Sequence, residues 1–349
     1  MAFSNTYAPL DGADPYVGSG ISNREDLTDV LSILAPEETP ILSSLNKKKA
    51  NSTFVEWTVD SLADPTTTGI REGADVGQTI GDDADAGFVD KFAGRARLGN
   101  YIQKFRRAYQ VSDLQEAVDS VGPAKVAQAE AKSIRELKRD IEATLASAND
   151  RSVEDGVNTP YGLRGLGDWL DSAGPADVPA GFRTPAASIY TAAEAASAEF
   201  GEEALNDIIT SIFEQTGSTN DLMLVADTGL RRVIADFART SGSSDYSVRN
   251  VNFDGGSGQI TLRVDMYESD HGMVSIVNGN PSCMPNFGGS TANSSGYLIN
   301  PEYAGIHELI PLGSTRLPNQ GGGERGYVDC ALTLGVYHPQ AHGLIQDVT

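Results

Sequence analysis

The sequence predicts an α+β fold, in which helical and strand-like segments follow one another without a strict alternation. Residues 54–59 alternate between the two faces expected of a half-buried strand, whereas residues 205–213 repeat apolar side chains at the spacing of an amphipathic helix. The chain has 349 residues, of which 40% are hydrophobic. A chain of this length and composition can bury one or two cores.

The N-terminal region predicts a short helix followed by a turn and a strand. Asn23 can cap a helix over residues 24–34, whose polar and apolar side chains fall on opposite faces. Pro36 and Pro40 are expected to end that helix, because proline disrupts a helix interior. A lysine run at 47–49 then precedes the strand at 54–59.

Residues 63–94 are rich in Gly, Asp and Thr and contain few large apolar side chains. Their flanks, 53–59 and 95–105, both have strand character and can pair with each other. The pattern therefore favours a long projecting hairpin, and a disordered surface loop is the alternative.

The longest helical pattern begins at Gly122-Pro123 and runs to about residue 149. An apolar stripe including Ile134, Leu137 and Ile141 predicts a packed face. The opposite face carries basic side chains, at Lys125, Lys132, Arg135 and Arg139. This basic face is typical of a solvated helix partly neutralised by nearby acidic residues, and weak contact with nucleic acid is the alternative.

The second half of the chain continues the mixture of helices and strands. Residues 158–170 predict a compact turn anchored by Trp169, and the Pro- and Ala-rich residues 173–187 predict a linker. Further helices are expected at 205–217 and 230–238. Strands are expected at 222–226, 259–267, 273–277, 297–300 and 327–337.

The net charge of −22 disfavours nonspecific attraction of the whole molecule to nucleic acid and indicates a solvated acidic surface. Cys283 and Cys330 are too few for a disulfide framework, so a reducing compartment is expected. No secretory signal and no membrane-length apolar run is evident, which predicts a soluble intracellular product without a membrane partner.

The sharpest candidate for chemistry is Asp227-Thr228-Gly229, because aspartic peptidases place their catalytic Asp in this tripeptide after a strand. That catalysis needs two carboxylates that share a proton, and no second motif is evident. The alternative is that Asp227 or Thr228 caps the following helix. His338 and His342 have a metal-binding spacing, but helix-breaking residues adjoin them. We therefore expect no enzymatic activity, cofactor or metal.

Several motifs resemble those of tailed-phage major capsid proteins. The N-terminal ones are Arg24-Glu25-Asp26-Leu27, Thr39-Pro40-Ile41-Leu42, Phe54-Val55-Glu56-Trp57 and Asp60-Ser61-Leu62. The C-terminal ones are Asn300-Pro301-Glu302-Tyr303 and His338-Pro339-Gln340-Ala341-His342-Gly343. The order of these motifs, with a long helix between them, supports the resemblance.

The resemblance implies the phage major capsid (Johnson) fold first described in coliphage Hong Kong ninety-seven. The implied parts are an N-terminal arm, an extended loop, a peripheral domain with a spine helix, an axial domain and returning strands of the peripheral domain. Their expected bounds are residues 1–45, 46–105, 106–183, 184–296 and 297–349.

The function implied by the resemblance is self-assembly, through hexamers and pentamers, into an icosahedral head around double-stranded DNA. Assembly in the host cytoplasm and partnership with portal, scaffold and decoration proteins are further implications. Arm and loop residues expected between subunits are Tyr7, Tyr16, Lys47, Lys48, Lys49, Arg71 and Glu72. Lys125, Lys132, Arg135 and Arg139 are expected to face the lumen. Another self-assembling virion or surface-lattice protein is the main alternative, and an aspartic-type hydrolase is the other.

Overall fold

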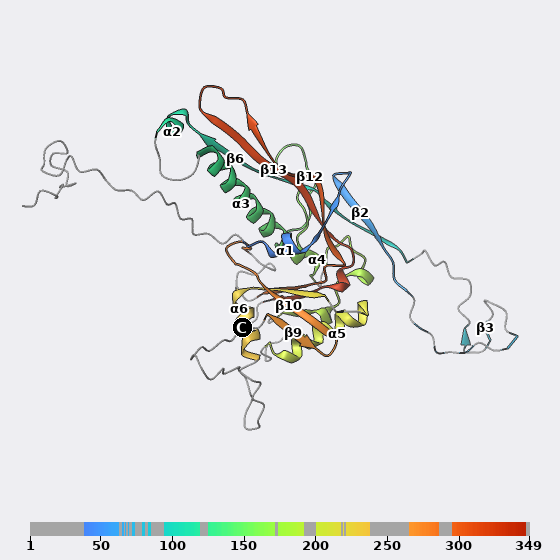
Figure 1. Ribbon diagram of the computed structural model, residues 1–349. Coiled ribbons are helices and arrows are strands. Elements are labelled where there is room, and N and C mark those ends of the chain that lie inside the picture. The colour runs from blue at the N-terminus through green and yellow to red at the C-terminus, as the bar shows by residue number, and fades with distance from the viewer. Residues whose placement is uncertain are drawn as a thin grey trace, which may run out of the picture.

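The chain forms two sheet regions that lie one beside the other in the computed structural model. The structure describes residues 38–62, 94–118, 125–171, 174–191, 200–217, 221–237, 265–285 and 295–346, with residue 219 and isolated positions between 65 and 84. Figure 1 shows helix α3 alongside strands β6 and β13 in one region, and helices α5 and α6 beside strands β9 and β10 in the other. The mixture of helix and strand confirms the predicted α+β class.

The first region is a four-stranded sheet with one long helix against it. Its strands, in spatial order, are β1 (Asn46–Lys49), β12 (Ala304–Leu317), β13 (Glu324–Val336) and β6 (Gln103–Val111). Strand β1 pairs parallel to β12, and the other pairs are antiparallel. Helix α3 (Lys125–Leu145) packs on this sheet through Leu137 and Ile141, which are buried. The long helix predicted from the apolar stripe is therefore present.

The second region is a six-stranded mixed sheet. Its strands, in spatial order, are β7 (Ile189–Thr191), β14 (Gly343–Gln346), β11 (Gly296–Ile299), β8 (Leu222–Ala226), β10 (Gly272–Asn278) and β9 (Met266–Ser269). Helices α5 (Glu202–Thr216) and α6 (Thr228–Phe237) pack on one face. The strands predicted at 222–226, 273–277 and 297–300 and the helices predicted at 205–217 and 230–238 are confirmed, whereas β9 begins only at Met266. Residues 259–264 of the strand expected at 259–267 lie outside the described residues.

Strand β8 separates the two larger hydrophobic cores found among the described residues. Its alternate residues Leu222, Leu224 and Ala226 pack with α5 and α6, whereas Met223 and Val225 belong to the larger core. The larger core also contains α3 and the inner halves of β12 and β13. A strand covered on both faces needs a continuous apolar sequence, which explains the run from Leu222 to Ala226. The larger core therefore draws side chains from both sheet regions, while the smaller core lies beneath α5 and α6.

A two-stranded ribbon extends from the first region (Figure 1). Strands β2 (Phe54–Val59) and β5 (Ala96–Tyr101) pair antiparallel, as expected for the flanks of a hairpin. Most of residues 63–94, between these strands, lie outside the described residues. Two short paired strands, β3 (Thr79–Ile80) and β4 (Asp83–Ala84), are described there. The tip of the predicted hairpin is therefore described only in part.

The remaining elements are short. They are α1 (Pro40–Ser44), α2 (Asp113–Ala117), α4 (Leu166–Trp169), and the 3₁₀ turns η1 (Ala180–Phe182), η2 (Ala186–Ser188) and η4 (Pro339–Ala341). The compact turn anchored by Trp169 is observed, since the Trp169 side chain is buried in the larger core.

One sequence prediction was wrong, and one helix was not predicted. Helix α1 begins at Pro40, where the missing N–H and fixed φ of proline are tolerated, although no helix was expected there. Residues 173–187 were expected to form a linker, but Val178 and Phe182 are buried in the larger core. Their apolar side chains outweigh the Pro- and Ala-rich composition of that segment. The helix predicted at residues 24–34 lies outside the described residues.

Candidate assembly surfaces

The four basic residues predicted on the long helix lie along α3, and they differ in how exposed they are. Lys125 donates to backbone carbonyls of α2 and its C-cap, including that of Glu116 at 3.2 Å. Arg139 donates to the carbonyl of Ser282 at 3.0 Å. Lys132 and Arg135 are exposed, and Lys132 lies 3.9 Å from Glu136. Lys132 and Arg135 are therefore the more accessible members of this face.

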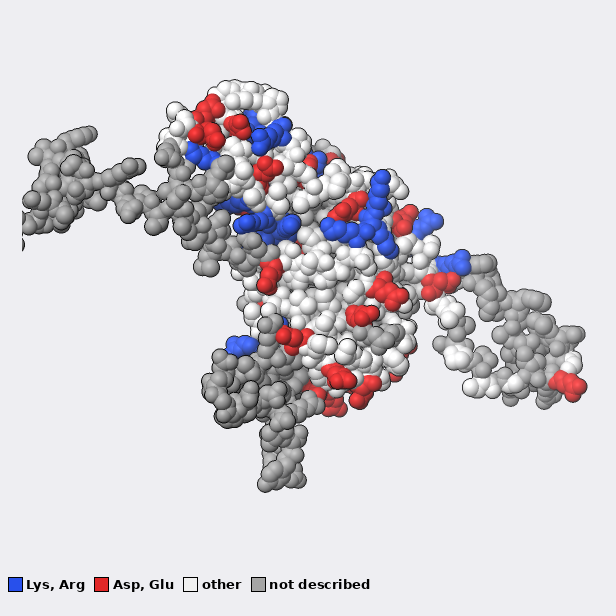
Figure 2. All heavy atoms as spheres, in the orientation of Figure 1, with Lys and Arg blue, Asp and Glu red and all other residues white. Residues whose placement is uncertain are grey.

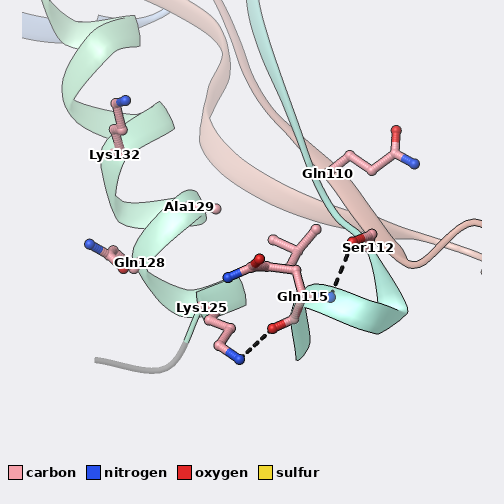
Figure 3. A pocket seen from close by; sticks show the side chains of 8 residues that line it. Gln110, Ser112, Gln115, Lys125, Gln128, Ala129 and Lys132 are labelled. Atoms are coloured by element: carbon pink, nitrogen blue, oxygen red, sulfur yellow. Dashed lines mark hydrogen bonds between the residues drawn. The ribbon is translucent and has the colours of Figure 1, made fainter. Parts of the chain in front are cut away.

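A hollow of about 740 Å³ lies between the start of α3, α2 and the end of β6 (Figure 3). It is lined by Gln110, Val111, Ser112, Gln115, Lys125, Gln128, Ala129 and Lys132. Ser112 caps α2, because its Oγ accepts from the backbone N–H of Gln115 at 3.2 Å. Lys125, which also lines the hollow, donates to the Gln115 carbonyl (Figure 3). Because this carbonyl lies in the last turn of α2, the Lys125 charge stabilises that helix.

The lysine run forms β1, at the edge of the four-stranded sheet. Lys47 pairs with Glu308 at 2.8 Å, and the Lys48 ammonium lies 4.2 Å from the centroid of the Tyr337 ring. Lys49 is exposed. Glu72 is exposed in a turn. Three further residues predicted between subunits lie outside the described residues, namely Tyr7, Tyr16 and Arg71.

The face of the four-stranded sheet opposite α3 is open over its outer half. On β6, Phe105 and Tyr109 point into the core and Arg107 reaches Asp140 of α3, so the alternate residues Lys104 and Arg106 point away. Both basic groups lie 3.2 Å from Asp329 of β13. All residues of β12 from Ile310 to Leu317 are exposed. We call this surface, made of outer β6, β12 and β13, the open sheet face.

The open sheet face combines basic and apolar groups. Arg106 covers the Tyr327 ring at 4.5 Å, and the register places Leu317 opposite Arg325. Ile310, Leu312 and Leu317 of β12 are 41%, 41% and 43% exposed. Exposed apolar side chains beside charged ones are typical of surfaces that bind another protein. The sequence did not reveal this surface, because β12 has no clear strand pattern of its own.

Charge is distributed unevenly between the two regions. In Figure 2 the basic side chains gather over the region of α3 and the four-stranded sheet, whereas the charged side chains visible over the six-stranded sheet are mostly acidic. In the sequence, only 9 of 26 basic residues follow Arg151 while 24 of 48 acidic residues do, and this second half supplies the whole six-stranded sheet together with β12 and β13. The region of the six-stranded sheet is therefore the more acidic one.

An ion cluster around the buried Arg164 joins the turn at 158–170 to β5 and β13. Arg164 is 1% exposed, and its guanidinium reaches Asp150 at 2.6 Å, Asp177 at 2.7 Å and Asp168 at 2.9 Å. The Asn100 side chain accepts from the Arg164 N–H and donates to the Leu334 carbonyl of β13. Burial raises the pKa of Asp168 to about 6 despite the nearby guanidinium. The cluster fixes the turn at 158–170 against both β5 and β13.

A second buried acid was also missed by the sequence analysis. Glu142 of α3 is fully buried, and its two carboxylate oxygens accept from the backbone N–H groups of Ile41 at 2.8 Å and Leu42 at 2.9 Å. Burial raises the pKa of Glu142 to about 7, although the two hydrogen bonds oppose that rise. In the sequence, Glu142 had no feature that separated it from the solvated acids of the same helix.

The residues considered for catalysis or metal binding contact neighbouring backbone and aromatic groups. Asp227 directly precedes α6, and its backbone carbonyl accepts from the Arg231 N–H at 2.9 Å, as expected of an N-cap residue; its Oδ1 accepts from the Thr228 N–H at 2.5 Å. Burial raises the pKa of Asp227, and its bonds to Thr228 oppose that rise. His342 is fully buried, with Nδ1 accepting from the Asn300 N–H at 3.1 Å. His338 packs edge-on against Phe182.

Within the described residues, no group of three His, Cys, Asp or Glu side chains is arranged to hold a metal ion. Burial raises the pKa of Cys330 to about 12, so its thiol stays protonated at neutral pH. Among the described helices, none is both long enough and apolar enough to cross a membrane.

Comparison with known proteins gives one family and one fold. The model of the SU10 major capsid protein family matches residues 11–349. The search of curated proteins gave no significant match. The capsid structure of cyanophage P-SCSP1u has a TM-score of 0.57 at 14% identity, covering 99% of this chain and 98% of that chain. The capsid protein of cyanophage A-1(L) has a TM-score of 0.59 at 14% identity, covering 93% and 97%.

The capsid of the native GTA particle also matches, with a TM-score of 0.55 at 12% identity, over 97% of this chain and 100% of that chain. At identities this low, the structural matches establish the fold alone. The family model spans nearly the whole chain, and it establishes the family. The expected phage capsid fold is confirmed by these matches. The chain belongs to the SU10 major capsid protein family.

Proposed function

We propose that copies of this chain form hexamers and pentamers that close into an icosahedral head around double-stranded DNA. The observation that carries the proposal is the match of the capsid family model to residues 11–349. A phage major capsid protein is a component of the virion and acts through contacts between its copies. Obligate interfaces of this kind commonly bury about 2,000 Å² or more, so large surfaces of each copy must be engaged.

In this assembly, residues 1–45 act as an arm and residues 46–105 as an extended loop, both reaching neighbouring copies. Helix α3 serves as the spine of a peripheral domain over 106–183, which residues 297–349 complete. Residues 184–296 form the axial domain around the local symmetry axes. The packing of α3 on the sheet of β6, β12 and β13 supports the peripheral domain, whereas β14 and most of β11, which also lie within residues 297–349, pair in the six-stranded sheet.

The open sheet face receives residues 63–94 of a neighbouring copy. Charge complementarity supports this contact: residues 63–94 contain seven acidic and two basic residues, a net charge of −5. The open sheet face presents Lys104, Arg106 and Arg325 against one acid, Asp329. A local basic surface on a chain of net charge −22 favours an acidic partner segment.

Charge removal tests this contact. The double variant Lys104→Gln/Arg106→Gln is expected to lower shell yield, measured by sedimentation, while the monomer keeps its circular dichroism spectrum. Lys138→Gln is the matched control, because Lys138 is exposed on α3, away from the open sheet face. Equal yields for the double variant and the control would contradict the assignment of this face.

The exposed residues Lys132 and Arg135 of α3 make weak nonspecific contact with the packaged DNA. Their accessibility supports this role, whereas Lys125 and Arg139 hold neighbouring segments. Two charges per copy add up over a shell, yet they leave each contact weak enough for DNA to slide during packaging. Portal, scaffold and decoration proteins are the further partners proposed, and assembly takes place in the host cytoplasm.

Electron microscopy of the purified full-length chain, at several protein and salt concentrations, tests the assembly itself. Closed shells, or hexameric and pentameric capsomers, are the expected result. Tubes or flat lattices would instead support another kind of self-assembling virion protein. A chain that stays monomeric alone, and also when co-expressed with the neighbouring structural genes of its phage, would overturn the proposal.

A further inference from the structure

The short helix α1 begins the described part of the chain, and it lacks a cap of its own. The Thr39 side chain makes no capping hydrogen bond, and Pro40 has no N–H to satisfy. The Ser43 N–H reaches the Thr39 carbonyl at 3.1 Å. This leaves the N–H groups of Ile41 and Leu42 as buried first-turn donors that need acceptors from elsewhere.

Both donors are satisfied by one side chain that lies about a hundred residues away in the sequence. Glu142 Oε1 accepts from Ile41 N–H at 2.8 Å, and Oε2 accepts from Leu42 N–H at 2.9 Å. Glu142 and Ile41 are both fully buried. A helix of five residues is not stable in isolation, so α1 depends on these bonds and on the burial of its apolar side chains.

The surroundings of Glu142 offer its charge little other support. Helix α1 has no titratable side chain. On α3, one turn before Glu142, Lys138 is exposed and Arg139 donates to the Ser282 carbonyl. Burying a carboxylate is expensive, and the two charge-assisted hydrogen bonds offset part of that cost. The contact is therefore held by the two α1 amides specifically, and Glu142 gains little from α3 itself.

We propose that Glu142 is a positioning residue that anchors α1, at the base of the N-terminal arm (residues 1–45), to α3. The arm joins the folded body at α1, so the direction in which it leaves is set where α1 is fixed. This inference rests on the proposed assembly function for its consequence, but its structural part can be tested on the unassembled chain.

Hydrogen exchange of the unassembled full-length chain tests the anchor. Glu142→Ala is expected to speed exchange at Ile41 and Leu42 at least tenfold, while the amides of β8 and β13 keep their protection. Glu142→Gln is expected to give a smaller increase, because a carboxamide offers one acceptor oxygen in place of two. Glu136→Ala is the matched control, since Glu136 lies on the same helix with a partly exposed side chain.

Two results would overturn the anchor. One is unchanged exchange at Ile41 and Leu42 in both Glu142 variants. The other is equal loss of protection at these amides and throughout β8 and β13, which would make Glu142 a general stabiliser of the fold. If Glu142→Ala does not fold, Glu142→Gln carries the same comparison.

Shell yield then tests the consequence for assembly. Glu142→Ala is expected to lower the yield at least tenfold relative to Glu136→Ala, and equal yields would overturn the role of the anchor in assembly. Should the wild-type chain form no shells under any condition, the proposed assembly fails, while the exchange result still decides whether Glu142 holds α1.

Discussion

Two fully buried titratable residues respond to pH in opposite directions. Glu142 has a pKa raised to about 7, because burial penalises its carboxylate. His342 has a pKa lowered to about 4, because burial penalises its imidazolium. His342 Nδ1 accepts from the Asn300 N–H, which requires this nitrogen to be unprotonated. Each residue therefore makes its own contribution to the pH dependence of stability.

Glu142 is expected to make the protein less stable as pH rises from about 4.5 to 7. In this window the folded state binds a proton at Glu142 that the unfolded state has already released, so its contribution is present at low pH and lost on the way to pH 7. The shift corresponds to about 3 kcal/mol. Denaturant unfolding of the wild type and Glu142→Gln at pH 5 and pH 7.5 measures it, and parallel pH profiles would contradict the assignment.

His342 is expected to make the protein less stable as the pH falls, the opposite of the effect of Glu142. Its stabilising contribution is present above about pH 6.5 and is lost as pH falls toward 4, since the unfolded state takes up the proton first. The variant His342→Gln keeps a hydrogen-bond acceptor but does not titrate. Between pH 6.5 and 4, its free energy of unfolding should fall by about 3 kcal/mol less than that of the wild type, in the same denaturant measurements. An equal loss in both proteins would place the titration elsewhere.

At the scale of elements, the turn at 158–170 is held against the end of α3 by close backbone contact. A Cβ added at Gly165, which precedes α4, would lie 2.1 Å from the carbonyl oxygen of Ser147. The Gly165 N–H also donates to the Asn149 carbonyl. The glycine is therefore required by the approach of two backbones, since its φ of −79° is open to any residue.

Gly165→Ala is expected to destabilise the fold by roughly 2–4 kcal/mol, because backbone on both sides would have to move. Gly181→Ala is the matched control: a Cβ there meets nothing within 4 Å, so stability should stay within about 0.5 kcal/mol of the wild type. Thermal unfolding of the two variants measures the difference. Equal melting temperatures would show that the turn can shift at little cost.

At the scale of the whole molecule, assembly must bring together copies that each carry a net charge of −22. Long-range repulsion between copies is screened as salt increases, because the Debye length falls from about 30 Å at 0.01 M to about 10 Å at 0.1 M. Contacts such as that proposed for the open sheet face are also weakened, but only at higher salt because their charges lie close together.

Shell yield is therefore expected to pass through a maximum as sodium chloride is raised from 0.01 to 1 M. Light scattering after dilution into each salt concentration measures the yield. For the double variant Lys104→Gln/Arg106→Gln, the shell yield should fall much less at high salt than that of the wild type. The reason is that the variant lacks the attractive charges that high salt screens. A wild-type yield that falls steadily from the lowest salt would show that attraction, and not repulsion, dominates between copies.

The sequence by itself determined the fold class, the long helix α3, the pairing of the β2–β5 ribbon and the buried strand β8. Each of these elements has a local signal: an apolar stripe, a pair of strand-like flanks or a continuous apolar run. Motif resemblance added the capsid family, which the family model supports.

Tertiary structure alone decided the rest. Pro40 begins α1 because Glu142 supplies the acceptors for the next two amides, and residues 173–187 pack because Val178 and Phe182 find a core. Strand β12 contains Pro311 and two register shifts, so it becomes a strand through its pairing with β13. Such contacts join residues far apart in the chain, and no local pattern of polarity or spacing records which distant partner a side chain will meet.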